Sequence, residues 1–194
     1  GRLVAPLAVR FIVVPIIDEA ASTRSRPLPV PRGLVTALGD QLDLRRRYSS
    51  PDLVIFENAA WVPVRSTLST LGAEASKLAG AASTIVADLA GAAPVLSSSR
   101  PDFGATAPIE AGTLHLAVPY SPGWKLQMGS TSISSRTAFG VTTAFDVPTA
   151  GTATLTYSSS AVRLLAILAE MGLWAATVFL ALARARKKEI ITTS

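Results

Sequence analysis

The sequence predicts an α+β protein with three parts: a small strand-helix-strand unit, an antiparallel β-sandwich-like domain and one C-terminal transmembrane helix. Three observations support this prediction. Residues 1–65 place a helical pattern between two short apolar runs, and residues 94–160 alternate apolar and polar side chains between turn residues. Leu164 to Ala183 is almost free of charge. A connector rich in alanine, residues 66–93, joins the first two parts.

The first part, residues 1–65, predicts a small α/β unit. Leu3–Ile17 is apolar enough for a membrane span, but it contains Pro6, Arg10 and Pro15 and has only fifteen residues, so a buried strand at Val9–Pro15 fits better. Leu53–Asn58 predicts a second strand. Between them, Gly33–Leu44 predicts a short amphipathic helix with one apolar side, formed by Leu34, Val35, Leu38 and Leu42.

The connector at 66–93 has apolar residues at spacings of three and four, which favours a helix. Gly72, Gly80 and Gly91 each weaken that helix by up to about 1 kcal/mol relative to alanine. Thr84–Val86 is the alternative, a short strand. The sequence leaves both interpretations open.

The third segment, 94–160, predicts a β-rich domain. Its strands are short, and Pro119 to Gly123, Pro148 and Gly151 mark turns between them. Such spacing is typical of a small antiparallel sandwich. The predicted strands are Gly112–Val118, Trp124–Met128, Phe139–Val147 and Thr152–Tyr157.

The apolar stretch within 161–183 predicts a transmembrane helix, because twenty helical residues rise about 30 Å, the thickness of the hydrocarbon core. Four cations follow in the tail 184–194, which marks the cytoplasmic side. Residues 1–160 are then extracytoplasmic at the cell membrane. The alternative is a long buried helix of a soluble protein.

Glu170 is the single charge inside this span, and Gly172 and Ala176 form a pair of small residues four apart. We expect these three residues to pack against other transmembrane helices of a parent protein. The alternative is a lone anchor in which Glu170 is protonated or reaches toward Arg163.

Composition excludes several functions. The formal charge is +5, but the five cations from Arg163 onward and the glutamates Glu170 and Glu189 supply +3 of it, so we expect no nucleic-acid partner. The chain has no cysteine, which excludes disulfides and thiolate metal sites. Its first residues do not resemble a signal peptide. An exported domain needs an export route, so we expect a C-terminal fragment of a longer membrane protein.

The sequence contains no recognisable enzyme motif. It has no phosphate-binding glycine loop, no Gly-x-Ser-x-Gly and no His-Glu-x-x-His. His115 is the only histidine, and its alternating surroundings predict an ordinary sheet residue. The carboxylates are scattered, so no acid and base pair stands out. We expect this fragment to be noncatalytic, with no metal and no cofactor.

Aromatic residues near strand ends are the candidate binding residues, because flat rings can stack on sugar faces. Trp61, Tyr120 and Trp124 stand at such places, as do Glu57 and Asn58. The alternative is that the rings fill the core and that Glu57 and Asn58 cap a turn.

Several segments together resemble a family. Val9–Pro15, Asp43–Arg46 and Val54–Pro63 are similar to the pattern VRYVVVP, LDLRR and VYENAAWAPR. Tyr120–Leu126 is similar to YSxxWRL, and Ala138–Val147 to AFGWANAFDV. Gly151–Tyr157 with Glu170–Trp174 matches a closing GxATLxY and LW. The chain departs from the pattern at Phe11, where tyrosine is usual, at Val64, where arginine often follows the proline, and at Val141, where tryptophan is expected.

This pattern occurs in the C-terminal region of large actinobacterial membrane proteins identified as family 2 glycosyltransferases. Related sequence motifs occur in polytopic bacterial membrane proteins that act on lipid-linked sugars. The resemblance implies that the chain is an extracytoplasmic accessory module in cell-envelope glycan synthesis, and that the catalytic domain of the parent lies elsewhere. Its partners would be the lipid bilayer, the parent's other transmembrane helices and a glycan or lipid-linked sugar. Two alternatives remain: a carbohydrate-binding module that presents an acceptor glycan, and a structural cap on a membrane helix bundle.

Overall fold

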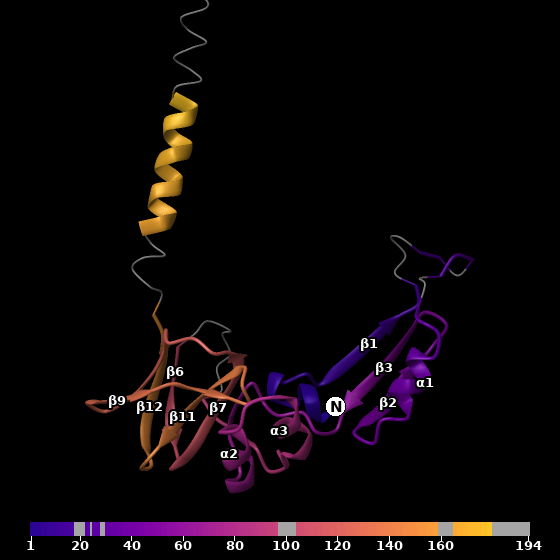
Figure 1. Ribbon diagram of the computed structural model, residues 1–194, viewed down its shortest axis with the longest axis horizontal. Helices are drawn as coiled ribbons and strands as arrows, with labels where there is room; N and C mark the ends of the chain where they lie inside the picture. The colour runs from indigo at the N-terminus through magenta and orange to yellow at the C-terminus, as the bar shows by residue number, and fades with distance from the viewer. Residues whose placement is uncertain (18–21, 24, 28–29, 97–103, 159–164, 180–194) are drawn as a thin grey trace, which may run out of the picture. The chain divides into compact units, whose positions relative to one another are not determined.

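The computed structural model describes residues 1–17, 22–23, 25–27, 30–96, 104–158 and 165–179 (Figure 1). The chain divides into two compact units, Gly1–Thr156 and Tyr157–Ser194. The first unit contains the sheets, and every strand pairing with a determined register is antiparallel. A mixed α+β fold with mostly antiparallel sheets is therefore confirmed.

The first sheet has three strands in the order β1-β3-β2. Its strands are β1 (Phe11–Pro15), β2 (Leu44–Ser49) and β3 (Leu53–Asn58). Helix α1 (Leu34–Gly39) packs beside it, and the inner face holds a small core around Val14, Leu44, Val54 and Phe56 (Figure 1).

The predicted strand-helix-strand unit thus gains a third strand. Sequence analysis missed β2 because its three consecutive arginines lack the apolar alternation of a half-buried strand. A charged strand at the edge of a sheet is common, since charge discourages pairing with other chains. The predicted helix also ends five residues early, at Gly39, so the apolar side does not extend to Leu42, which is fully exposed.

A second sheet has five strands in the order β10-β11-β7-β4-β5, and a third has four in the order β6-β12-β8-β9. The two sheets bury their side chains in one shared cluster around Leu114, Leu126, Phe145 and Leu155. The strands are β4 (Arg65–Thr67), β5 (Ala93–Pro94), β6 (Ala105–Ile109), β7 (Gly112–Pro119), β8 (Trp124–Met128), β9 (Thr131–Ser134), β10 (Arg136–Ala138), β11 (Thr142–Val147) and β12 (Gly151–Tyr157).

Three short helices lie around a second core, which contains residues of the first two helices, residues that follow the third and residues of the five-stranded sheet. They are the 3-10 helix η1 (Arg2–Leu7) and the α-helices α2 (Thr70–Ser76) and α3 (Ala81–Val86). Ala5, Leu68, Leu89 and Phe139 are buried in this cluster. The connector therefore forms two short helices, and Gly80, with a φ of 98°, lies between them. The Ser69 hydroxyl begins α2 by accepting a hydrogen bond from the Gly72 N–H at 3.2 Å.

The turn between β10 and β11 needs its glycine. Phe139 and Gly140 both have positive φ, 51° and 76°, and the Val141 N–H donates to the Ala138 carbonyl at 3.0 Å. A side chain at Gly140 would place its Cβ 3.1 Å from the backbone nitrogen of Gly80. The turn thus combines a left-handed backbone with close contact to the connector.

The second unit contains a helix at residues 165–179. Among the residues that the structure describes, no helix has both the length and the apolar character that a membrane crossing needs. The fold therefore gives no support to the predicted transmembrane helix at 161–183. Residues 161–164 and 180–183 of that prediction, and the tail 184–194, lie outside the described residues.

Candidate functional site

The cavity beside Trp61 is the best candidate site in the first unit. It has a volume of about 220 Å³. Its walls come from η1, from the segments before β2 and after β3, and from α3 with the residues that follow it. The lining residues are Arg2, Ala5, Leu42, Asp43, Ala59, Ala60, Trp61, Thr84, Ala87, Asp88, Leu89 and Ala90.

Asn58 determines where Trp61 lies. Its side chain is fully buried at the end of β3, and its amide nitrogen donates to the carbonyls of Gly1 and Val9, both at 3.0 Å. Its amide oxygen accepts from the Ala60 N–H at 3.0 Å. These bonds end the strand in a tight turn and join it to η1 and β1. Asn58 therefore builds the wall of the site and does not line the cavity.

Arg10, the residue before β1, contacts the indole of Trp61. Its guanidinium carbon lies 4.8 Å from the centroid of the Trp61 ring and 5.1 Å from that of Phe11. Its Nε also donates to Glu57 Oε1 at 3.2 Å. Cation–π contacts of this kind orient an aromatic ring. Trp61 is partly exposed, so the oriented ring is accessible to a ligand.

Two carboxylates and one guanidinium give the cavity its polarity. Burial raises the pKa of Asp43, but hydrogen bonds, above all the one from the Arg2 backbone N–H, outweigh burial and hold that pKa below its usual value. Asp88 Oδ1 accepts from the Ala90 N–H at 2.9 Å. The Arg2 guanidinium makes one long bond, 3.4 Å, to the Ile85 carbonyl. A ring beside carboxylates and a cation suits a small hydroxylated ligand.

Glu57 lies outside the Trp61 cavity and forms ion pairs with two arginines. Its carboxylate lies between Arg10 and Arg47, and Arg47 Nε donates to Oε2 at 2.5 Å. The hydrogen bond from Arg47 is the main reason that the pKa of Glu57 is lowered. Glu57 is not among the residues that line the Trp61 cavity.

Tyr120 and Trp124 line a separate cavity of about 310 Å³ with residues of β8 and β9. Trp124 is 8% exposed and belongs to the core between the two sheets, whereas Tyr120 is 43% exposed. Trp61 is absent from the lining of this cavity, so the three predicted aromatic residues do not share one site.

The predicted packing residues of the C-terminal segment all lie on the helix at 165–179 and are exposed. Gly172 and Ala176 share one face. At about 100° per residue, Glu170 lies roughly 160° around the helix from Gly172 and 120° from Ala176. A single neighbouring helix could therefore contact the small pair or Glu170, but not both.

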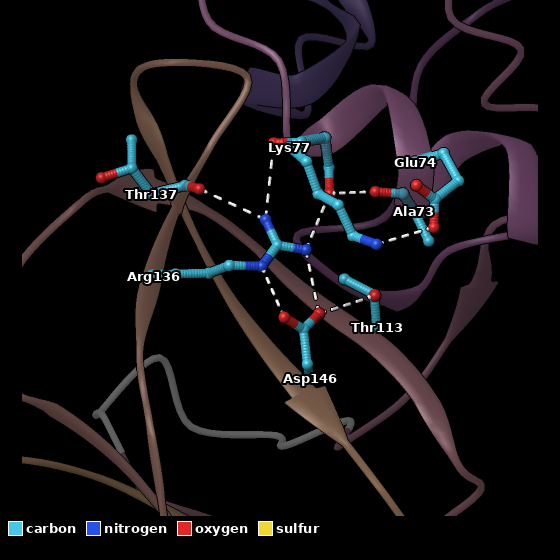
Figure 2. Close-up of polar contacts among 8 residues, drawn as sticks. Ala73, Glu74, Lys77, Thr113, Arg136, Thr137 and Asp146 are labelled. Carbon is cyan, nitrogen blue, oxygen red and sulfur yellow. Dashed lines mark hydrogen bonds and ion pairs between the residues drawn. The ribbon is translucent and has the colours of Figure 1, made fainter.

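Sequence analysis missed a polar network that connects β10, β11, β7 and α2 (Figure 2). Arg136 donates from Nε to Asp146 Oδ2 at 2.7 Å and from a terminal nitrogen to Oδ1 at 2.9 Å. The same side chain donates to the Ser76 hydroxyl at 3.0 Å, and Thr113 donates to Asp146 at 2.9 Å. The Arg136 hydrogen bond is the main reason that the pKa of Asp146 is lowered. This network joins helix to sheet and leaves no open site.

His115 is fully buried on β7, which excludes it from contact with an external ligand. Thr142 donates its hydroxyl hydrogen to the Ala138 carbonyl at 3.0 Å, so it accepts from His115 Nε2 at 3.0 Å. Within the described part of the chain, Nδ1 has no hydrogen-bond partner, and neither has the buried hydroxyl of Ser66, its neighbour on β4. Burial, followed by the charge of Arg136, lowers the pKa of His115 to about 4.

Metal chemistry has no visible support in the described part of the chain, where no three His, Cys, Asp or Glu side chains form a group that could hold an ion. Comparison with known proteins adds no assignment: no family model, curated protein or solved structure matches this sequence.

Proposed function

We propose that this chain is a noncatalytic, extracytoplasmic accessory module of a multi-pass membrane glycosyltransferase that makes cell-envelope glycan. The C-terminal segment, 161–183, would anchor the module in the membrane, with the tail 184–194 on the cytoplasmic side. Residues 1–160 would then face the envelope, where the acceptor glycan is found.

The observation that carries the proposal is the surface of the helix at 165–179. Eight of its large apolar side chains are each at least 45% exposed: Leu165, Ile167, Leu168, Met171, Leu173, Trp174, Val178 and Phe179. They are distributed around most of the helix circumference at about 100° per residue. Exposing apolar side chains to water is unfavourable. A helix that is apolar on nearly all sides is therefore stable only when lipid or protein surrounds it.

The accessory role is supported by the positions of the motif residues. Asn58 and Trp124 are buried and stabilise the fold, and the only histidine is enclosed in the core. The resemblance to membrane glycosyltransferases suggests that such a module would act in the synthesis of cell-envelope glycan.

Membrane topology is the direct test, and it uses a parent protein from which any cysteine outside this cysteine-free chain has been removed. Thr131→Cys on β9 and Ser194→Cys in the tail are introduced singly into the parent protein. A maleimide that cannot cross membranes should label Thr131→Cys in intact cells and Ser194→Cys only after permeabilisation. Labelling of Thr131→Cys only after permeabilisation would overturn the proposal.

The Trp61 cavity favours a second candidate function, binding of the acceptor glycan. Trp61 supplies a ring, and Arg2, Asp43 and Asp88 supply polar partners for hydroxyl groups. Titration calorimetry of the full chain with neutral oligosaccharides tests it. Trp61→Ala should weaken binding about tenfold or more, as the loss of a stacked aromatic ring predicts. Tyr120→Ala, in the other cavity, is the matched control and should bind normally.

A further inference from the structure

The outer face of the three-stranded sheet combines exposed apolar side chains with arginines. Phe11, Val13 and Tyr48 are 50%, 53% and 53% exposed, whereas the inner face of the same sheet is covered by α1 and its core residues. Large apolar side chains gathered on one sheet face usually mark a contact surface. We call this surface the outer face; its residues are Arg10, Phe11, Val13, Arg45, Arg47, Tyr48, Ile55 and Glu57.

Strand register brings these residues together. Glu57 in the central strand is opposite Phe11 on one side and Arg45 on the other, and Ile55 is opposite Val13 and Tyr48. Directly opposed residues of an antiparallel sheet project to the same side. The outer face therefore has one row in which the charges of Glu57 and Arg45 lie beside Phe11, and a second row without charge.

Charge on this face is unbalanced. Arg10 and Arg47 both bind Glu57. With Arg45, the face has three arginines and one carboxylate, which gives a net charge of +2. The side chains of Arg10 and Arg47 remain 49% and 58% exposed despite these ion pairs. Arg46, by contrast, lies against Phe56 on the inner side, with its guanidinium carbon 5.6 Å from the ring centroid. The outer face thus attracts anions and offers apolar contact beside them.

We propose that the outer face docks on an anionic phospholipid bilayer. Aromatic side chains settle at the level of the headgroups, and each arginine near an anionic surface adds electrostatic attraction. The exposed apolar side chains need an apolar environment, and the arginines need negative charge. An anionic bilayer offers both over one flat surface, so it fits better than a protein partner. The inference rests on the proposed membrane location for access to lipid.

The experiment places a dye in the outer face of the full chain. Val13→Cys is labelled with an environment-sensitive fluorophore, and the protein is incorporated into nanodiscs of phosphatidylcholine alone or with added phosphatidylglycerol. Docking should shift the emission to shorter wavelength and lower quenching by acrylamide by about half in anionic discs, since the site moves into the headgroup region. Neutral discs should leave the dye as exposed as in detergent.

Charge variants make the test specific. Arg45→Glu brings the net charge of the outer face from +2 to zero and should abolish the lipid-dependent shift; among the described residues the ion pairs of this face involve Arg10 and Arg47, so this change breaks neither. Lys125→Glu makes the same charge change at an exposed position of β8 and should leave the shift intact. A dye at Thr131→Cys on β9 should respond to neither lipid.

Equal emission in neutral and anionic discs overturns the proposal, and so does an unchanged shift in Arg45→Glu. A shift that needs an added protein, and not anionic lipid, assigns the face to a protein partner and also overturns it. Failure of the topology test with an intact dye response would refute only the extracytoplasmic placement, so the two proposals fail separately.

Discussion

The three-stranded and five-stranded sheets place their polar residues in opposite ways. The three-stranded sheet leaves the arginines of its strands exposed to solvent, and Asn58 is the one polar residue of these strands that is buried. The five-stranded sheet buries Ser66, Thr113, His115, Thr142 and Thr143. Buried polar groups stabilise a fold only when they are hydrogen-bonded, as the three threonines and His115 Nε2 are, whereas exposed ions contribute little to stability and remain available to partners. The first sheet is therefore the better candidate for contact with other molecules, and the second is the better candidate for structural support.

The largest predicted difference concerns the two cores. Phe145 and Phe56 are both fully buried, but Phe145 lies between two sheets and Phe56 in the small core under α1. Phe145→Ala should lower the free energy of unfolding by about 4 kcal/mol, and Phe56→Ala by about 3 kcal/mol because a small core collapses more readily around a cavity. Urea denaturation measures both values. A larger loss in Phe56→Ala would reverse this ranking of the cores.

Hydrogen exchange sharpens the same comparison. Phe56→Ala should expose the amides of β1 to β3 while those of β7 and β11 stay protected, because the two phenylalanines lie in separate clusters. Uniform loss of protection would show that the sheets unfold as one cooperative unit.

His115 gives the second largest effect, and it depends on pH. Its pKa in the folded chain is about 4, below the ordinary 6.5, so folding favours the neutral ring. The stabilisation is complete above about pH 6.5 and is lost as the pH falls toward 4, by roughly 3 kcal/mol in total. Unfolding free energies measured between pH 7 and 4 should show a smaller decrease in His115→Gln than in the wild type. Parallel curves would contradict the buried, neutral state of His115.

Asn58→Ala should cost about 2 kcal/mol, because it leaves two backbone carbonyls and one N–H without their partner. Glu57→Gln, one residue away, should leave the unfolding midpoint nearly unchanged, since the carboxylate interacts with exposed arginines. Thermal denaturation compares the two variants. If Asn58→Ala instead folds normally and reduces glycan output of the parent, Asn58 has a binding role.

Strands with alternating side chains were predictable from the sequence, and charged or very short ones were not. Leu53–Asn58 and Trp124–Met128 match β3 and β8 at both ends. The edge strand β10 has three residues, too few for any period to emerge. Trp61 was correctly placed after a strand, but no local pattern could show that residues of η1 and α3 complete its cavity. The partnership of Arg136 with Ser76 spans sixty positions and depends on tertiary packing.

The network in Figure 2 supplies the next prediction. Arg136 is 25% exposed and binds a carboxylate through two nitrogens, besides reaching the hydroxyl and carbonyl of Ser76. Arg136→Ala should lower the free energy of unfolding by about 1 to 2 kcal/mol, since hydrogen bonds to charged groups exceed neutral ones. Arg136→Lys cannot reproduce the two-pronged contact and should recover less than half of the loss. Full recovery in Arg136→Lys would mean that charge alone matters.

The smallest effect should come from the ion pair on α2 and its C-cap. Lys77 Nζ lies 2.7 Å from Glu74 Oε1, as close as the Arg136 contact, yet the two side chains are 51% and 66% exposed. Water screens such a pair and ordering two flexible chains offsets the attraction, so Lys77→Ala should change the free energy of unfolding by less than about 0.5 kcal/mol. Urea denaturation in low and high salt measures it against Arg136→Ala. Equal losses in the two variants would mean that the distance between the charges matters more than the lower exposure of Arg136, whose partner Asp146 is itself 54% exposed, and more than its additional hydrogen bonds to Ser76.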